Sequence, residues 1–111
     1  MSNAAIAIQE GAVAPDLEIR IADAFDAKLS SKALRELLAE VDRADQEAQE
    51  GSRKANAIAL DPATRPDAVA AARKLMEDAD FRRLRMERAK DKLTELQKAA
   101  VRREAGGSAE N

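Results

Sequence analysis

The sequence predicts an all-α protein built as an antiparallel two-helix hairpin, and three observations indicate it. Ala, Leu, Glu, Lys and Arg dominate the 111 residues, which is a composition typical of long helices. Residues 34–58 and 68–100 repeat apolar side chains with the alternating three- and four-residue spacing of a coiled coil. The segment between them contains Pro62 and Pro66, and proline interrupts a helix interior. We therefore expect two helices that fold back on each other.

The hairpin has few large side chains with which to fill a core. Alanine accounts for 26 of the 50 hydrophobic residues, which leaves 24 larger ones. A domain of this size buries too little apolar surface to be comfortably stable alone. We therefore expect the hairpin to self-associate into a helical bundle, or to pack against the N-terminal segment.

Charge is divided unequally along the chain. The net charge is −2, but residues 1–62 carry 7 basic and 12 acidic residues, and residues 63–111 carry 12 basic and 9 acidic. Opposite net charge on the two arms favours their pairing with each other. No apolar run is long enough to cross a membrane, and the start lacks the basic flank of a signal peptide. We expect a cytoplasmic protein with no membrane partner.

Residues 1–28 form a leader before the hairpin. We expect disorder or loose packing over residues 1–16, where Gly11 and Pro15 interrupt regular structure. Residues 17–21 then alternate apolar and charged side chains, which is typical of a strand. The alternative is a short helix over residues 16–27, which spaces Leu17, Ile21 and Phe25 four residues apart. Of the two we favour the helix.

The first long helix is predicted over residues 30–60, within a hairpin domain of residues 29–105. Ser30 is a natural N-cap, and Leu29 with Leu34 fits a hydrophobic staple. Pro62 ends the helix and moves Asp61 out of helical geometry. The stripe that faces the second helix comprises Leu34, Leu37, Val41, Ala44, Ala48, Gly51, Ala55 and Ile58.

Gly51 stands inside this stripe, where it costs about 1 kcal/mol relative to alanine. A kink is one explanation. Close approach of the second helix is the other, and we favour it because Ala48 and Ala55 flank the glycine on the same stripe.

The second long helix is predicted over residues 65–104, followed by a disordered tail over residues 106–111. Thr64 and Asp67 have the spacing of a capping box, and Pro66 lies in the first turn. The stripe comprises Ala68, Ala72, Leu75, Ala79, Arg82, Met86, Ala89, Leu93, Leu96 and Ala100. Facing residues should have numbers that add to roughly 126, given equal rise along both helices. That register places Leu75 beside Gly51 and Leu93 beside Leu34.

The chain has few of the residues that catalysis uses. It contains no His, Cys, Tyr or Trp, which excludes Ser-His and Cys-His nucleophiles and zinc sites built on these ligands. No glycine-rich phosphate loop occurs. We therefore expect no enzyme, no cofactor and no metal site.

A basic cluster on the second helix is the sharpest functional candidate. It comprises Arg82, Arg83, Arg85, Arg88, Lys90 and Lys92, and Phe81 precedes it. Interleaved acids and the acidic first helix favour ion pairing within or between subunits, and contact with a nucleic-acid backbone is the alternative. Phe81 and Leu84 should point away from the first helix. They would then contact either the N-terminal segment or a second subunit.

Part of this pattern resembles a known group. The residues concerned are Leu60-Asp61-Pro62, Ala71-Ala72-Arg73, Met76-Glu77-Asp78-Ala79, Phe81-Arg82-Arg83 and Arg85. Over residues 34–100 the chain resembles small coiled-coil proteins of unknown function from bacterial prophage regions. The resemblance implies a phage-derived accessory or assembly factor and supplies no site residues.

The leading functional hypothesis is a non-enzymatic helical interaction or assembly protein that binds itself, and another protein is a further candidate partner. The first alternative is a nucleic-acid-binding or regulatory helical dimer that uses the basic stripe of the second helix. The second alternative is a phage inhibitor that docks the acidic first helix onto a host nucleic-acid-binding protein.

Overall fold

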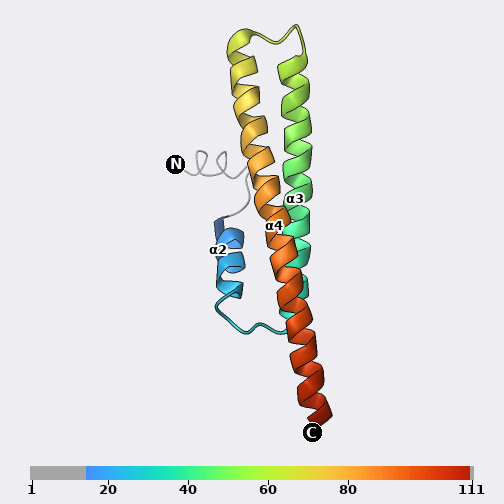
Figure 1. The fold of residues 1–111 in the computed structure, drawn as a ribbon. Helices are drawn as coiled ribbons and strands as arrows, with labels where there is room; N and C mark the ends of the chain where they lie inside the picture. The colour runs from blue at the N-terminus through green and yellow to red at the C-terminus, as the bar shows by residue number, and fades with distance from the viewer. Residues whose placement is uncertain (1–14, 111) are drawn as a thin grey trace.

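The computed structural model describes residues 15–110, with side chains for residues 16–106. This part of the chain folds into three helices (Figure 1): α2 (Pro15–Ala24), α3 (Ser31–Leu60) and α4 (Pro66–Glu110). The all-α prediction is confirmed. The prediction of disorder over residues 1–16 falls mostly outside the described residues, as does Asn111.

The described chain has a third helix, α2, beside the two of the predicted hairpin; the short helix favoured over residues 16–27 is confirmed, with the bounds Pro15–Ala24. The strand alternative for residues 17–21 is wrong, because these residues lie inside α2. A ten-residue helix is marginal alone. Here Leu17 and Ala24 are buried in the core shared with α3 and α4, and that burial stabilises α2.

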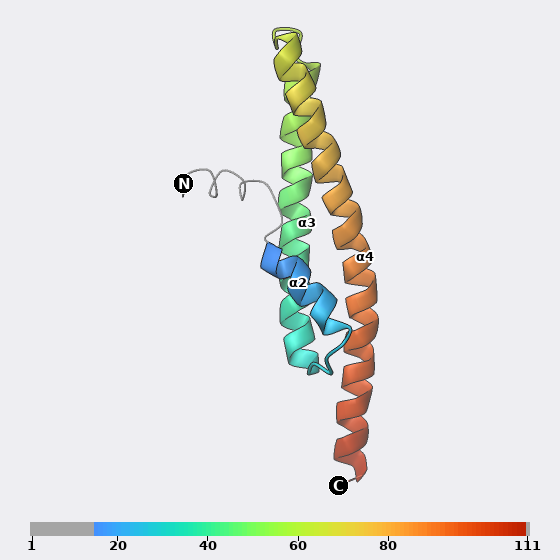
Figure 2. The ribbon, with the colours of Figure 1, turned by 90° about the vertical axis from the view of Figure 1, so that its left-hand side faces the viewer.

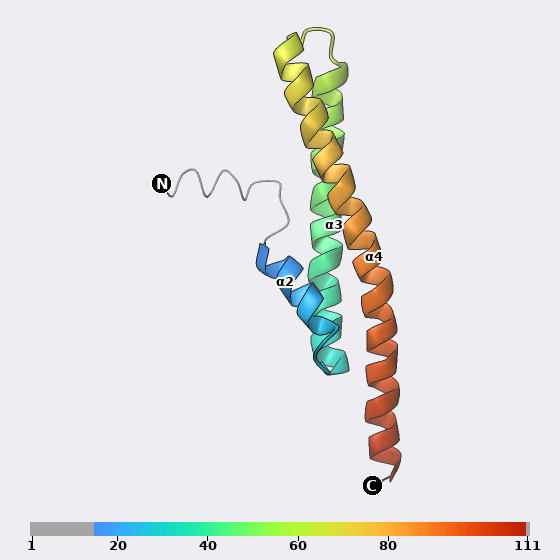
Figure 3. The same ribbon diagram turned by 60° about the vertical axis from the view of Figure 1, so that its left-hand side comes forward.

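The helices are arranged as a long pair with a short helix beside it. α3 and α4 lie side by side and run in opposite directions (Figures 1 and 3). α2 lies obliquely across the half of the pair that is far from the 61–65 turn (Figure 2). Ion pairs fasten α2 to both long helices: Arg20 binds the Glu40 carboxylate with both Nη atoms, and Arg85 reaches Glu18.

The start of α3 is capped as predicted. Ser30 has extended backbone geometry, and its Oγ accepts a hydrogen bond of 3.1 Å from the Ala33 N–H. Glu104, from the far end of α4, accepts two further bonds, from the Ser31 N–H at 2.8 Å and from Ser31 Oγ at 2.7 Å. A carboxylate at a helix N-terminus is favourable because unpaired N–H groups gather there. α4 thus helps to cap α3.

The turn follows from its two prolines. Asp61 is extended, as expected before Pro62, and its Oδ1 accepts from the Ala63 N–H at 2.9 Å. α4 begins at Pro66, and the Arg65 carbonyl accepts its first helical hydrogen bond, from the Val69 N–H. The predicted capping role of Thr64 is therefore wrong, because Pro66 at the first helical position makes Arg65 the capping residue.

The end of α4 lies beyond the predicted limit. The sequence predicted a helix to residue 104 and a disordered tail over residues 106–111, but α4 continues to Glu110. Glycine lowers helix propensity without forbidding a helix. The Glu104–Ser31 bonds anchor the preceding turn, and elongation of a formed helix adds one backbone hydrogen bond per residue.

The core lies between α3 and α4 and beneath α2. It buries most of the residues predicted for hairpin packing. These are Leu34, Leu37, Val41, Ala44 and Ala48 on α3, with Ala79, Met86 and Leu93 on α4.

Four residues of the predicted stripes are misplaced, and one of them is Ala68, which is exposed. Leu75 is 60% exposed, and Ile58 is also exposed. A Cβ at Gly51 would meet nothing within 4 Å, so close helix approach does not explain this glycine. At the next position, Met76 is half-buried, and it continues the four- and three-residue spacing between Ala72 and Ala79 as well as Leu75 would.

The predicted register is also wrong. Ser52 pairs with Asp80, and Asp42 pairs with Lys90, so facing residues have numbers that add to about 132 and not to 126. Other pairs lie on either side of this value, from 128 for Asp45–Arg83 to 135 for Asp45–Lys90. The cause is the shape of the turn. The extended Asp61 carries the chain past the end of α3, and α4 begins beyond it (Figure 1).

Among the described residues, no helix is both long enough and apolar enough to cross a membrane.

Candidate interaction surface

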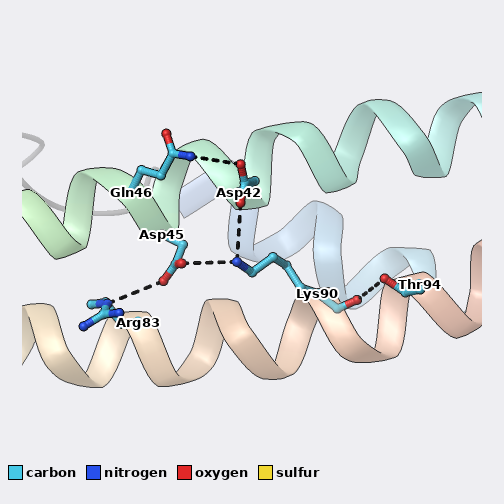
Figure 4. Close-up of polar contacts among 6 residues, drawn as sticks. All are labelled: Asp42, Asp45, Gln46, Arg83, Lys90 and Thr94. Carbon is cyan, nitrogen blue, oxygen red and sulfur yellow. Dashed lines mark hydrogen bonds and ion pairs between the residues drawn. The ribbon is translucent and has the colours of Figure 1, made fainter.

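Two cations of the predicted basic cluster bind acids on α3. Lys90 Nζ lies 3.2 Å from Asp45 Oδ2 and 3.4 Å from Asp42 Oδ1 (Figure 4). Arg83 Nε lies 3.8 Å from Asp45 Oδ1, an ion pair too long for a hydrogen bond. Desolvation tends to lower the pKa of Lys90, but its bonds to Asp45 and Asp42 outweigh this and raise the pKa above its usual value. These charges hold α3 and α4 together.

A third cation of the cluster binds α2. Arg85 Nη2 donates to Glu18 Oε1 at 2.7 Å, and this hydrogen bond raises the pKa of Arg85. Arg82 is half-buried. The predicted basic stripe is thus largely engaged with the rest of the chain, as the interpretation of intramolecular pairing expected.

Two cations of the cluster differ from the others. Arg88 and Lys92 are exposed, and within residues 16–106 neither has an ion pair. Both line an open groove of about 410 Å³ between α2 and α4. Their charges are therefore available to a ligand or a partner.

The same groove is mainly apolar. Phe81 is 62% exposed, Leu84 is 60% exposed and Phe25 is 46% exposed, and Ile21 is half-buried beside them. The buried Ala89 also lines the groove. We call Ile21, Phe25, Phe81 and Leu84 the apolar patch. Large apolar side chains grouped in this way typically mark an interaction site.

Leu84 also borders a second groove, of about 310 Å³, on the α3 side of α4. Four charged residues line this groove as well, namely Asp45, Asp80, Arg83 and Glu87. Asp80 accepts a hydrogen bond of 2.6 Å from Ser52 Oγ there. Leu84 therefore stands on a ridge of α4 between two grooves.

Sequence reasoning identified Phe81 and Leu84 as pointing away from α3. It did not include Ile21 and Phe25 in the candidate site, although their four-residue spacing with Leu17 was visible. Leu17 is buried whereas Phe25 is exposed, so the same apolar face of α2 contributes to the core and to the surface. Only the oblique placement of α2 decides which of these residues is buried in the core and which is exposed on the surface.

The surface offers apolar side chains and two exposed cations. Within residues 16–106 no group of three or more His, Cys, Asp or Glu residues is placed to hold a metal ion. The fold and the patch together define an all-helical protein with an apolar surface flanked by unpaired cations. No family model matches the chain, and no curated protein or solved structure is detectably similar to it.

Proposed function

We propose that this protein is a non-enzymatic helical assembly protein that binds a second copy of itself through the apolar patch. In this proposal α3 and α4 act as a coiled-coil hairpin, and two hairpins associate into a helical bundle. The observation that carries the proposal is the exposure of Phe81 and Leu84 beside Phe25, on the side of α4 that α3 leaves open.

The energetic argument is simple. Fully burying a Leu or Phe side chain contributes about 1.5–3 kcal/mol. Phe81 and Leu84 are mostly exposed in the single chain, and a symmetric interface would bury both of them twice. A contact of this kind supplies the burial that the alanine-rich pair lacks. The resemblance to prophage coiled-coil proteins adds the proposal that the assembly serves a phage-derived accessory role.

The test is the mass of the purified protein in solution, measured by sedimentation equilibrium at tens of micromolar. We expect a dimer or a larger assembly. Phe81→Asp should dissociate it without loss of helical circular dichroism, because the side chain contributes little to the core of the single chain. Leu75→Asp is the matched control, since Leu75 is as exposed as Leu84 but lies outside the patch. A monomeric wild-type protein would refute the proposal.

A second candidate function rests on Arg88 and Lys92, whose unpaired charges suit a phosphate backbone. Arg83, Arg85 and Lys90 support it less, because each already binds an acid of its own chain. The test is a gel shift with duplex DNA and with RNA at low salt. Binding that disappears in Arg88→Glu/Lys92→Glu would support this function, and no binding at low salt would exclude it.

Docking of an acidic α3 onto a host protein has the weakest support. Three of the six acids of α3, Glu40, Asp42 and Asp45, bind cations of α2 or α4. A partner that used these three acids would have to displace Arg20 or Lys90 first.

A further inference from the structure

A second stripe of residues runs along α4 on the side away from α3. Counting about 100° per residue from Phe81, the positions 70, 74, 77, 81, 84, 88, 91 and 95 all fall within about 80° of it. They follow one another at alternating four- and three-residue spacing, the repeat of a coiled-coil seam. The buried Ala79, Met86 and Leu93 lie on the opposite side, against α3. We call the exposed stripe the outer seam.

The central charges of the outer seam are ordered so that, in a second copy running in the opposite direction, each would meet a charge of opposite sign. Its central residues, in chain order, are Lys74, Glu77, Phe81, Leu84, Arg88 and Asp91. A two-fold axis between positions 82 and 83 would bring Phe81 opposite Leu84 of a second copy. The same axis would bring Glu77 opposite Arg88 and Lys74 opposite Asp91. The four charges at these positions then face opposite charges, whereas Arg73 and Lys92, at the two edges of the same arc, would face each other.

The charged residues of the central seam do not bind other residues within the described part of the chain. Lys74, Glu77, Arg88 and Asp91 are all exposed, and none of them has an ion pair or a side-chain hydrogen bond there. Other charged residues of α4, such as Asp80, Lys90 and Glu104, do bind residues of α3. These four charges are thus available to pair with a reversed second copy.

A parallel arrangement in register would give the opposite result. Each residue would face its own copy, so that Lys74, Glu77, Arg88 and Asp91 would all meet like charges. Like charges placed together at an interface are unfavourable and select against that arrangement. Charge order therefore separates the two directions, although the apolar patch alone does not.

We propose that a second copy of the chain binds the outer seam with its α4 antiparallel, about a two-fold axis between residues 82 and 83. Phe81 and Leu84 form the apolar centre, and Glu77–Arg88 and Lys74–Asp91 pairs flank it on both sides. Ile21 and Phe25 border the seam and extend the apolar surface. This inference rests on the proposed self-association and specifies its geometry.

The first experiment is a charge exchange measured by sedimentation equilibrium. Arg88→Glu replaces two attractive pairs with two repulsive ones, which should raise the dimer dissociation constant about tenfold. The double variant Glu77→Arg/Arg88→Glu restores opposite charges across the axis and should return the constant to within about threefold of the wild type. Circular dichroism confirms that each variant is helical. A double variant as weak as Arg88→Glu would overturn the inference.

The second experiment uses engineered disulfides to determine the direction and register of the two α4 helices in the dimer. It is possible because the chain contains no Cys of its own. Glu77→Cys and Arg88→Cys are made separately and oxidised alone and as a mixture. Residues 77 and 88 are about 16 Å apart along a helix. Like positions of an antiparallel dimer are separated by the same distance, which is beyond disulfide reach. We therefore expect a cross-linked dimer only in the mixture.

The outcomes separate the two proposals. Cross-linking of Glu77→Cys with itself would indicate a parallel dimer and would overturn the inference while leaving self-association intact. A dimer with no cross-link in the mixture would overturn the register. A monomeric wild-type protein would refute self-association and this inference together.

Discussion

The two halves of the α3–α4 pair are built from different side chains. Near the 61–65 turn, the buried residues are Ala55, Ala72 and Ala79. Far from the turn, the pair buries larger apolar residues, and α2 adds Leu17 and Ala24. These larger residues are Leu34, Leu37, Val41, Met86 and Leu93.

The difference shows where the stability of the single chain lies. Burial of a Leu, Val or Met side chain contributes about 1.5–3 kcal/mol, and one methyl group contributes about 0.8 kcal/mol. The turn-distal half therefore supplies most of the hydrophobic stabilisation. The turn-proximal half depends on alanine's helix propensity and on the hydrogen bonds of the turn. It also leaves Ile58, Leu60 and Leu75 exposed.

The largest expected effect comes from the turn-distal core. Leu93 is fully buried, so Leu93→Ala should lower the free energy of unfolding by about 2–5 kcal/mol through lost burial and a cavity. Leu75→Ala makes the same change in the same helix at an exposed site and should cost less than about 0.5 kcal/mol. Urea denaturation of both variants measures the difference. Equal losses would contradict the division into two halves.

The next largest effect is expected at Ala48, where the two halves of the α3–α4 pair meet. Ala48 is buried between α3 and α4, and a leucine there overpacks the contact at a cost of about 1–3 kcal/mol. Ala57→Leu is the control, because Ala57 is exposed on the same helix. Thermal unfolding followed by circular dichroism compares the two. If Ala48→Leu were as stable as the control, the contact at Ala48 would be looser than its burial indicates.

A smaller effect of opposite sign is expected in the turn-proximal half. Gly51 lies inside α3, and a methyl group added there would meet nothing within 4 Å. Gly51→Ala should therefore raise the free energy of unfolding by about 0.5–1 kcal/mol, measured by urea denaturation. Gly106→Ala, near the end of α4, should have less effect, because the last turns of a helix fray. A destabilised Gly51→Ala variant would revive close helix approach as the role of this glycine.

The smallest effect concerns pH. The Ser31 N–H and hydroxyl bonds lower the pKa of Glu104 below 4.5. A lowered pKa in the folded state means that the contribution is present above pH 4.5 and is lost as pH falls through the folded value. Glu104→Gln should therefore be less stable than the wild type at neutral pH, with the difference in thermal unfolding shrinking in acid. Glu87→Gln, which makes the same change at an exposed site of the same helix, is the matched control.

Local features of the fold were predictable because neighbouring residues cause them. Ser30 caps α3 through its own hydroxyl, and Pro62 imposes an extended Asp61. The choice between Leu75 and Met76 was not predictable in this way. Both residues fit the repeat after Ala72, and only the tertiary structure leaves Leu75 exposed and Met76 half-buried. Half of the candidate site was predicted, namely Phe81 and Leu84 of α4. Their neighbours Ile21 and Phe25 belong to α2, and only the folded chain brings α2 beside α4.

The sequence by itself determined that the chain is helical, where α3 begins and that the 61–65 segment turns, because caps, prolines and periodicity act within a few residues. Only the tertiary structure decided the register of the pair, the side of the pair that α2 covers and the charges that stay unpaired on the outer seam. These depend on how far the turn carries the chain past α3, and a shift of a few residues changes every contact between the helices.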